Sequence, residues 1–452
     1  MQRLLCLLLF CSSALADTPP NIVMIISDDQ SWTDYSFMGH PDIQTPHLDR
    51  LAAGSATFRR GYVPIALCRP SLVTMITGLY PHQHGVTGND PWKDNRIPAD
   101  VYAARREQLI SKLDACQTLP TLLKQRGYLS HQSGKWWEGN FKRGGFTHGM
   151  TRGFPQPGGR HGDDGLDIGR KSMTPVFEFV DMAAEQKKPF FLWYAPFLPH
   201  TPHNPPADIL KKYQQPGRDP KLAKYYAMCD WFDVTCGQLM DHLEQAGVAD
   251  NTMIVYVTDN GWIQRTGETT VPSGWKPSFA PKSKQSPNEG GTRTPIMISW
   301  PGKISPAERP EVVSSIDLAP TILQAAGIDV PERMPGVNLL PVLQDGQDLG
   351  RERIFGESYA HDVADIDNPE ETLLFRWVIE GRWKLLLTYD GKVNRYKPVH
   401  LREDLRPQLY DLVADPHETQ NLAADHPQEV ARLARELDQW WHVKERKVLT
   451  KF

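Results

Sequence analysis

The strongest constraint on the fold comes from short, continuous apolar runs that end directly in polar residues. Four such runs span residues 21–26, 128–133, 190–195 and 253–257, and segments with helical spacing lie between them. Continuous apolar strands are typical of a sheet whose two faces are both buried under helices. We therefore predict an α/β fold, with a large, mostly parallel sheet sandwiched by helices.

Apolar residues at helical spacing predict the helices that cover this sheet. These segments are residues 46–54, the stretch after Cys68, and residues 175–186, 222–247 and 317–326.

The pattern changes beyond residue 345. Residues 372–389 alternate as two short strands around Glu380-Gly381, residues 409–412 form another strand, and residues 428–441 have helical spacing. These features predict a small antiparallel sheet closed by a C-terminal helix. Because 452 residues exceed what one core usually supports, we assign residues 17–345 to a large first domain and 346–452 to a C-terminal subdomain.

The N-terminus predicts export. Arg3 precedes an apolar run over residues 4–10, and Ala14-Leu15-Ala16 has the form of a cleavage site. This arrangement is typical of a secretory signal peptide, which we assign to residues 1–16. We expect a periplasmic or secreted protein after cleavage near Ala16, with no membrane span. The formal charge of −4 excludes a basic nucleic-acid-coating protein.

Four cysteines would remain after cleavage. Cys229 and Cys236 are seven residues apart on one predicted helix, so the helical rise separates them by roughly 10 Å, too far for a disulfide. We predict that both are small core residues. Cys116 has no predicted role, and Cys68 requires a different explanation.

Polar residues follow the predicted strands at the edge where a parallel sheet binds its ligands. Asp28 and Asp29 follow the first run, and Asp259 and Asn260 follow the last. Three carboxylates and an amide oxygen suit Ca²⁺ or Mg²⁺. The alternative is that these residues only form helix caps and turns.

Two irregular stretches follow strand ends that carry chemistry. Residues 141–165 hold eight glycines, and residues 262–284 are rich in Gly, Pro, Ser and Thr. Long loops inside a compact domain are usually functional or disordered, so we expect both to face the substrate. Flexible surface connections remain the alternative.

The segment Cys68-Arg69-Pro70-Ser71 begins a predicted helix, and together with other motifs it resembles the sulfatase family of the alkaline-phosphatase-like superfamily. The matching segments are residues 26–30, 68–78, 80–82, 133–136, 199–202, 258–261, 289–295, 317–321 and 409–422. They occur in family order and cover nearly the whole mature chain.

The resemblance implies that a formylglycine-generating maturation enzyme oxidises Cys68 to formylglycine. One hydroxyl of the hydrated aldehyde would attack sulfur as the alcohol leaves, and the other would then expel sulfate. The resemblance also implies one divalent cation, Ca²⁺ in most of the family, bound by Asp28, Asp29, Cys68, Asp259 and Asn260. The cation would polarise the sulfate and lower the pKa of the attacking hydroxyl.

Three further residues match family positions. Lys135 and Lys284 match lysines that contact the sulfate and would stabilise charge on its oxygens. His200 matches a histidine near the scissile oxygen and is a candidate to protonate the leaving alcohol.

Two positions depart from the family pattern. Leu72 stands where the modification motif usually has arginine, and Trp137 stands where a histidine usually assists the nucleophile. Arg69 is adjacent in sequence but should point elsewhere. Trp137 would either present an apolar face to a sugar ring or simply pack. The possible substitutes for the missing histidine are His82, His84 and His203.

We therefore expect an exported sulfatase that acts on sulfate esters of carbohydrates. The first alternative is a phosphodiesterase or phosphonate monoester hydrolase, since the same layout serves phosphoryl transfer. The second is a catalytically silent glycan-binding relative, because of Leu72 and Trp137.

Overall fold

A computed structural model describes residues 19–389, 407–444, 446 and 448. Within these residues a nine-stranded sheet has the order β10-β2-β8-β7-β1-β6-β4-β5, with β9 paired to β2. The predicted signal peptide, residues 1–16, lies outside the described residues.

The centre of this sheet consists of the four predicted strands. They are β1 (Asn21–Ser27), β4 (Leu129–Gly134), β6 (Phe190–Ala195) and β7 (Thr252–Thr258). β1 pairs in parallel with both β6 and β7, and β6 pairs in parallel with β4. The prediction of a mostly parallel sheet is confirmed, and all four carboxyl ends meet at one edge.

The remaining strands of this sheet extend it on both sides. They are β2 (Ala56–Tyr62), β5 (His148–Gly149), β8 (Arg293–Ser299), β9 (Ala307–Arg309) and β10 (Val313–Ser314). β8 runs antiparallel to both β7 and β2, so the sheet is mixed on this side.

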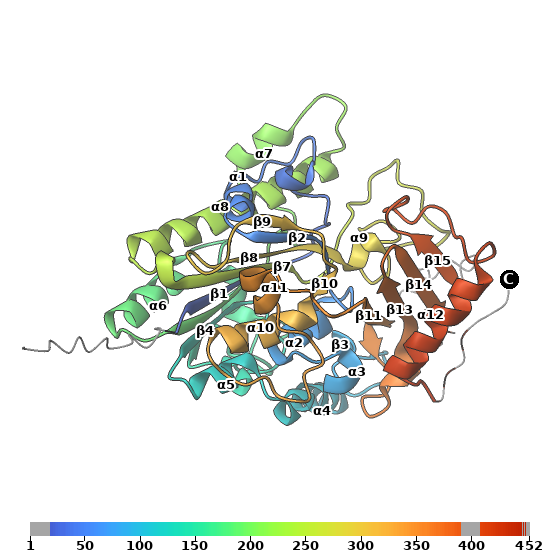
Figure 1. Cartoon of the computed structure of the whole chain (residues 1–452), viewed down its shortest axis with the longest axis horizontal. Coiled ribbons are helices and arrows are strands. Elements are labelled where there is room, and N and C mark those ends of the chain that lie inside the picture. Colours follow the sequence, from blue (N-terminus) through green and yellow to red (C-terminus); the bar gives the residue numbers. More distant parts are fainter. Residues whose placement is uncertain (1–18, 390–406, 445, 447, 449–452) are drawn as a thin grey trace, which may run out of the picture.

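Helices cover both faces of the sheet (Figure 1). Side chains of β1 alternate between two cores, with Met24 in one and Ile25 in the other, and both are fully buried. α2 (Cys68–Thr77), α5 (Leu119–Lys124) and α10 (Leu318–Ala325) pack into the first core. α1 (Pro46–Ala53), α6 (Thr174–Glu185) and α8 (Pro220–Gln245) pack into the second.

Six other helices connect these layers or pack at their margins. They are α3 (Pro81–His84), α4 (Ala99–Ile110), α7 (Ala207–Tyr213), α9 (Glu289–Thr292), α11 (Leu340–Asp345) and the C-terminal α12 (Pro427–Trp440). Among the described residues, no helix is both long and apolar enough to cross a membrane.

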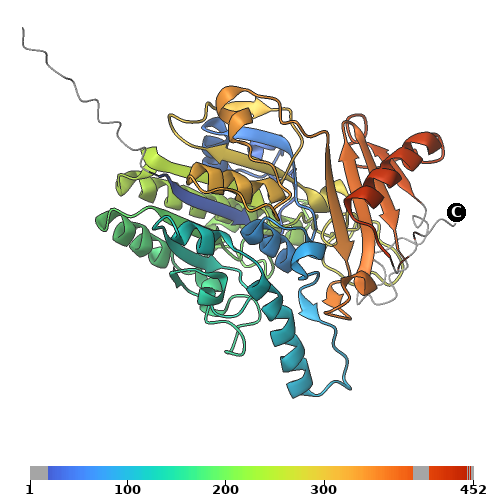
Figure 2. The same cartoon turned by 60° about the horizontal axis from the view of Figure 1, so that its bottom comes forward.

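A second, antiparallel sheet confirms the predicted C-terminal architecture. Its order is β11 (Arg353–Tyr359), β13 (Leu373–Glu380), β14 (Trp383–Thr388) and β15 (Gln408–Asp411). This sheet stands beside the large one, and α12 covers its outer face (Figures 1 and 2). Leu433 and Leu437 of α12 pack on this face, whereas Trp377 packs toward Tyr62 of β2. The domain bounds 17–345 and 346–452 stay a prediction.

A two-stranded ribbon links the two parts of the chain. β3 (Asp90–Pro91) pairs in parallel with β12 (Asp362–Val363), which places Asp90 opposite Asp362. The ribbon therefore brings residues from both parts to one place.

The cysteines follow the sequence predictions. Cys229 and Cys236 are fully buried on α8, and Cys68, Cys116, Cys229 and Cys236 are all free thiols.

Candidate active site

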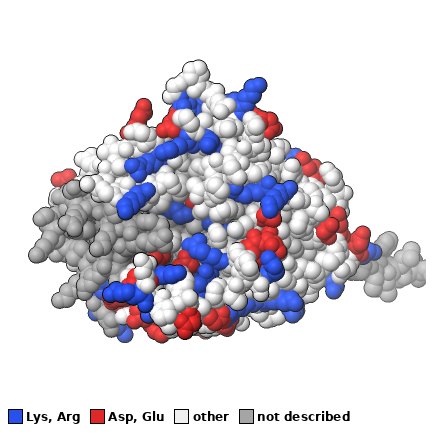
Figure 3. Space-filling model, turned by 180° about the vertical axis from the view of Figure 1, so that it is seen from behind, with Lys and Arg blue, Asp and Glu red and all other residues white. Residues whose placement is uncertain are grey.

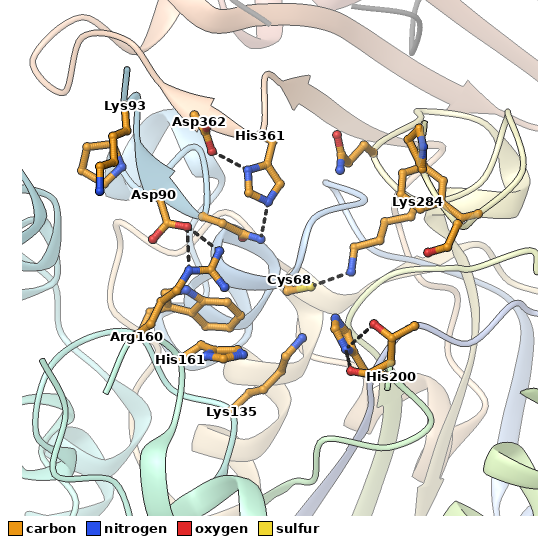
Figure 4. Close-up of a pocket in the computed structure, with 18 of the residues that line it drawn as sticks. Cys68, Asp90, Lys93, Lys135, Arg160, His161, His200, Lys284, His361 and Asp362 are labelled. Carbon is orange, nitrogen blue, oxygen red and sulfur yellow. Dashed lines mark hydrogen bonds and ion pairs between the residues drawn. The ribbon is translucent and has the colours of Figure 1, made fainter. Parts of the chain in front are cut away.

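The carboxyl ends of the central strands bring the predicted residues together. Four strands and one helix supply these residues. Asp28 and Asp29 follow β1, Lys135 follows β4, and Asp259 and Asn260 follow β7. His200 lies a few residues beyond the end of β6, and Cys68 is the first residue of α2. Backbone hydrogen bonds fix these ends to one another, with Asp28 N donating to Leu198 O at 3.0 Å and Lys135 N to Ala195 O at 2.8 Å. Figure 4 shows Lys135, His200 and Lys284 around Cys68.

At this edge of the sheet the backbone segments lie very close to one another. Gly134, which precedes Lys135, has φ +83°, and a Cβ there would lie 1.7 Å from Ala195 O. Only glycine fits this turn. Asp29 has φ +65°, a conformation that costs free energy for a residue with a side chain. Such strain is typical of functional sites.

Two lysines form ion pairs with two of the three buried carboxylates. Lys135 Nζ donates to Asp28 Oδ1 at 2.7 Å, and Lys284 Nζ donates to Asp29 Oδ1 at 2.5 Å and to Cys68 Sγ at 3.2 Å. Burial alone would lower the pKa of each lysine, but the neighbouring carboxylates raise both above the ordinary value. Both ammonium groups are therefore charged beside Cys68.

The oxygen cluster has the chemistry of a site for a hard cation. Asp28 Oδ2, Asp29 Oδ2, Asp259 Oδ2 and Asn260 Oδ1 are buried, and none has a hydrogen-bond partner. Burial and the neighbouring carboxylates raise the pKa of Asp28 well above its ordinary value, although Lys135 opposes this, and the pKa of Asp259 is raised for similar reasons. Oxygen ligands of this kind fit Ca²⁺ or Mg²⁺, which would satisfy the unpartnered oxygens.

His200, the candidate proton donor, lies beside the same oxygen cluster. Its Nδ1 donates to Thr201 O at 2.6 Å, because a carbonyl oxygen can only accept, and its Nε2 lies 3.4 Å from Asp29 Oδ2. Ligand atoms of Asp28, Asp29, Cys68 and His200 all lie within 4.8 Å of one another. Burial, followed by the charges of the two lysines, lowers the pKa of His200 well below its ordinary value.

The Cys68 thiol is a poor nucleophile in this environment. Burial raises its pKa to about 12, although the charges of Lys135 and Lys284 oppose the rise. The thiol is therefore protonated at neutral pH, and the thiolate that nucleophilic cysteines require is scarce.

The structure gives Arg69 and Leu72 different surroundings. Arg69 donates through Nε and Nη2 to Glu138 at 2.6 and 2.7 Å, and both side chains are 1% exposed. As predicted, Arg69 points away from Cys68 and instead anchors the start of α2. Leu72 is buried in the apolar core, so it brings no charge to the site.

The Trp137 side chain is almost fully buried. Only 3% of it is exposed, and its ring lies 5.2 Å from Lys135 Nζ and 5.4 Å from the ring of His161. Trp137 also lines the cavity at Cys68, so it packs in the core and at the same time faces this cavity, which agrees with both interpretations. The indole also supports the Lys135 ammonium group.

The three candidate substitute histidines have other partners. His82 Nδ1 lies 3.1 Å from Glu357 Oε1, and His84 Nε2 lies 3.2 Å from Thr74 Oγ1. His203 packs beside Trp262 and Tyr225. Within the described part of the chain, none of the three histidines lines the cavity at Cys68. His161, which sequence reasoning missed, lines it instead.

A cavity of about 630 Å³ opens above Cys68. Residues of both irregular loops line it, including Arg160 and His161 from the glycine-rich loop and Trp262, Phe279 and Lys284 from the second. Both loops therefore line the cavity at Cys68, and that they face the substrate stays a prediction. The volume lies in the range of small-molecule sites.

Sequence reasoning also missed charged and polar residues that line this cavity, among them Asp90, Arg160, His361 and Asp362. No strand-end pattern marks them, because they reach the cavity through loops and through the β3–β12 ribbon. The sequence of this ribbon is too short for any periodic signal.

The C-terminal subdomain anchors the segment that carries Lys284. Lys282 Nζ donates to Glu418 O at 2.7 Å, and Glu289 N donates to Glu418 Oε2 at 2.7 Å. The fully buried Lys384 lies between Glu289 and Glu418, at 3.0 and 3.2 Å from their carboxylate oxygens. These bonds fix both ends of the segment around Lys284.

Among the described residues, charged groups of both signs are mixed on the face shown in Figure 3. Lys and Arg side chains there are interspersed with Asp and Glu, and much of the face is uncharged.

Comparisons with known proteins agree with this site. Residues 20–328 match the family model described as Sulfatase, and residues 283–444 match the model described as N-sulphoglucosamine sulphohydrolase, C-terminal. Arylsulfatase A of Homo sapiens is 29% identical, covering 92% of this chain and 86% of the relative. N-acetylgalactosamine-6-sulfatase of Homo sapiens is also 29% identical, covering 74% of this chain and 68% of the relative.

The fold also matches solved structures. The crystal structure of Ps i-CgsB superposes with a TM-score of 0.71 at 24% identity, covering 95% of this chain and 94% of that one. Ps i-CgsB has also been solved in complex with k-i-k-neocarrahexaose.

Proposed function

Since this chain belongs to the sulfatase family and is thus a sulfuric ester hydrolase, we propose that its substrates are sulfated carbohydrates. We propose further that it acts outside the cytoplasm, with formylglycine formed from Cys68 and with one divalent cation, Ca²⁺, at the oxygen cluster.

One observation carries this proposal. Four buried oxygens, one each from Asp28, Asp29, Asp259 and Asn260, have no hydrogen-bond partner. Asp28 and Asp29 lie beside Cys68, and hydrogen bonds join Asp259 and Asn260 to Asp29. Three carboxylates and two lysines leave a net negative charge, which a divalent cation would reverse. A site of this composition suits an anionic ester such as a sulfate.

Formylglycine would supply a hydroxyl nucleophile that the buried thiol, with its pKa of about 12, does not provide. A divalent cation held by the four oxygens would polarise the sulfate and favour ionisation of that hydroxyl.

The residues of the chain then have separate tasks. Lys135 and Lys284 bind the sulfate oxygens and stabilise the negative charge that develops on them. His200 lies at the same edge, and its Nδ1–H bond to Thr201 O fixes the orientation of the ring. In the neutral ring Nε2 carries no proton, so it would protonate the alcohol oxygen only after it has itself taken up a proton, for example from the attacking hydroxyl.

The carbohydrate part rests on the cavity and on the relatives. The cavity is lined by hydroxyl-binding groups as well as by Trp262 and Phe279, whose aromatic rings are able to pack against a sugar ring. One relative is named for N-acetylgalactosamine 6-sulfate, and one structural neighbour was solved with a neocarrahexaose.

The test is sulfate release by protein produced together with a formylglycine-generating enzyme. A panel of sulfated mono- and disaccharides, 4-nitrophenyl sulfate and 4-nitrophenyl phenylphosphonate is compared, with Cys68→Ser as the inactive control. Sulfate release from at least one sugar, faster than phosphonate hydrolysis, supports the proposal. Release from aryl sulfate alone contradicts the carbohydrate part, and faster phosphonate hydrolysis contradicts the sulfatase assignment.

Export has its own test. The full chain is expressed in a bacterial host, and the protein in the periplasm or medium is sequenced from its N-terminus. A start near Asp17 is expected. Retention in the cytoplasm with Met1 intact contradicts this part of the proposal.

A further inference from the structure

We propose that Arg160, held in place by Asp90, determines specificity by donating hydrogen bonds to the sugar hydroxyls of the leaving alcohol. This inference rests on the carbohydrate substrate proposed above. It concerns the side of the cavity that the sulfate does not occupy.

The cavity has two sides around Cys68. Lys135, His200 and Lys284 lie on the sulfate side, and Figure 4 shows Asp90, Lys93 and Arg160 on the opposite side from Lys284. Because the ester sulfur must lie against Cys68 and between the lysines, the alcohol must extend toward the remaining cavity. Arg160 is therefore placed to meet the alcohol.

Arg160 is a fixed donor. Its Nε donates to Asp90 Oδ2 at 2.9 Å, and its Nη2 donates to the same oxygen. Burial alone would raise the pKa of Asp90, but Arg160 and Arg106 hold it below the ordinary value, so the carboxylate is charged. The Arg160 side chain remains 43% exposed, and the described residues provide no partner for its Nη1. A guanidinium fixed in this way has hydrogens left to donate into the cavity.

The backbone beneath Arg160 is tied to the catalytic segment. Trp136 N donates to His161 O at 3.1 Å, and Arg106 Nη2 donates to Arg160 O at 3.1 Å. Gly165 of the same loop lies so close to Gly134 that a Cβ would come within 2.7 Å of Gly134 O. The loop therefore fixes Arg160 relative to Lys135, and with it the position of the sugar relative to the sulfate.

The charges on this side favour a neutral, hydroxyl-bearing ring over a second anionic group. Among the described residues, Asp90, Asp94 and Asp362 line it together with the cations Lys93 and Arg160, so these five side chains carry no excess of positive charge. Asp90 and Asp362 lie opposite each other on the β3–β12 ribbon. A second sulfate or a uronate here would compete with the Asp90 carboxylate for Arg160, whereas hydroxyls bind readily to the remaining hydrogens of the guanidinium.

The test compares two kinds of substrate for Arg160→Ala. Galactose 6-sulfate and N-acetylgalactosamine 6-sulfate carry free hydroxyls, and 4-nitrophenyl sulfate carries none. We expect kcat/KM on the sugar sulfate that the wild type prefers to fall about 10- to 100-fold, as for loss of a charge-assisted hydrogen bond. Hydrolysis of 4-nitrophenyl sulfate should stay within about twofold, because Arg160 does not touch the sulfate.

Three control variants sharpen the test. Arg160→Lys should not restore activity on the sugar, because an ammonium group lacks the planar fork. Asp90→Asn should lower the same kcat/KM, since it frees Arg160 to move. Arg152→Ala, in the same loop, removes an exposed ion pair with Asp164 at 3.1 Å and should leave both substrates unchanged.

The outcomes separate this inference from the function on which it rests. If the wild type hydrolyses sugar sulfates and Arg160→Ala retains that activity, only the inference fails. Equal losses on sugar and aryl sulfates also overturn it, since they indicate a structural or catalytic role. Faster hydrolysis of glucosamine 2-N,6-O-disulfate than of monosulfated sugars overturns the preference for a neutral ring. If the wild type releases sulfate only from aryl esters, the proposed substrate and this inference both fail.

Discussion

The buried pair of Arg69 and Glu138 offers the most quantitative test of how the site is held together. The two side chains share hydrogen bonds of 2.6 and 2.7 Å and are each 1% exposed. Glu138→Leu would leave the guanidinium buried without its charge partner. Breaking a buried pair in this way costs about 3–5 kcal/mol of unfolding free energy. At about 2 °C per kcal/mol for a large domain, the melting temperature should fall by about 6–10 °C.

The assay is thermal unfolding of protein with unmodified Cys68, so that all variants share one chemical state. The double variant Arg69→Met with Glu138→Leu should be less destabilised than Glu138→Leu alone, because it removes both charges. Asp167→Asn is the matched control. It breaks an exposed pair with Lys171 of 2.9 Å, which should cost less than about 1 kcal/mol. A loss at Glu138 no larger than at Asp167, or additive losses in the double variant, would refute the reasoning.

Three further predictions concern the subdomain contact, pH and the cation. Lys384→Met should lower the melting temperature strongly, because it leaves the buried Glu289 and Glu418 carboxylates facing each other; an unchanged melting curve would contradict this. Burial raises the pKa of Asp233 to about 7, although two backbone amides donate to its carboxylate. The raised pKa makes the protonated form of Asp233 stabilise the fold. This contribution is therefore full below about pH 4 and is lost as the pH rises through 7. Asp233→Asn should therefore gain stability relative to the wild type between pH 4 and 8 in parallel melting curves, and a constant difference would argue against this titration. Ca²⁺ added after bound cations have been removed with EDTA should raise the melting temperature. At a Ca²⁺ concentration of 100 times Kd the added stability should be about 2.7 kcal/mol, and Asp259→Asn should reduce this gain. Equal gains in both proteins would show that Asp259 does not bind the cation.

Three of the strand ends, those of β1, β6 and β7, were predictable from the sequence because an apolar run is followed closely by polar residues, whereas β4 contains several polar residues of its own. Asp28 and Asp259 are separated by more than two hundred residues, yet the parallel arrangement alone places them at one edge. The strands that sequence reasoning missed lack such runs. β2 contains Arg59 and Arg60, and β8 has Pro295 near its start, so neither has the pattern of a central strand.

The far side of the cavity could not be predicted from local patterns. Arg160 belongs to an irregular loop, and Asp362 reaches the cavity on a two-residue strand. Their positions depend on the path of loops and on how the second sheet packs beside the first. Sequence periodicity carries no information about either.

The resemblance identified the residues around Cys68 but not their partners. Arg69 pairs with Glu138, and Leu72 enters the apolar core, because α2 is buried along its whole length. Trp137 packs against Lys135 because β4, which ends just before this lysine, ends inside the apolar core.

The most direct test of the central claim is a paired measurement on one preparation. Protein co-expressed with a formylglycine-generating enzyme is digested, and the peptide that contains Cys68 is analysed by mass spectrometry while sulfate release is measured on the sugar panel. The account predicts formylglycine at Cys68 and sulfate release in proportion to its occupancy, with none from Cys68→Ser. An unmodified thiol at Cys68 together with undiminished sulfate release would contradict it, as would full conversion without release from any sulfate ester.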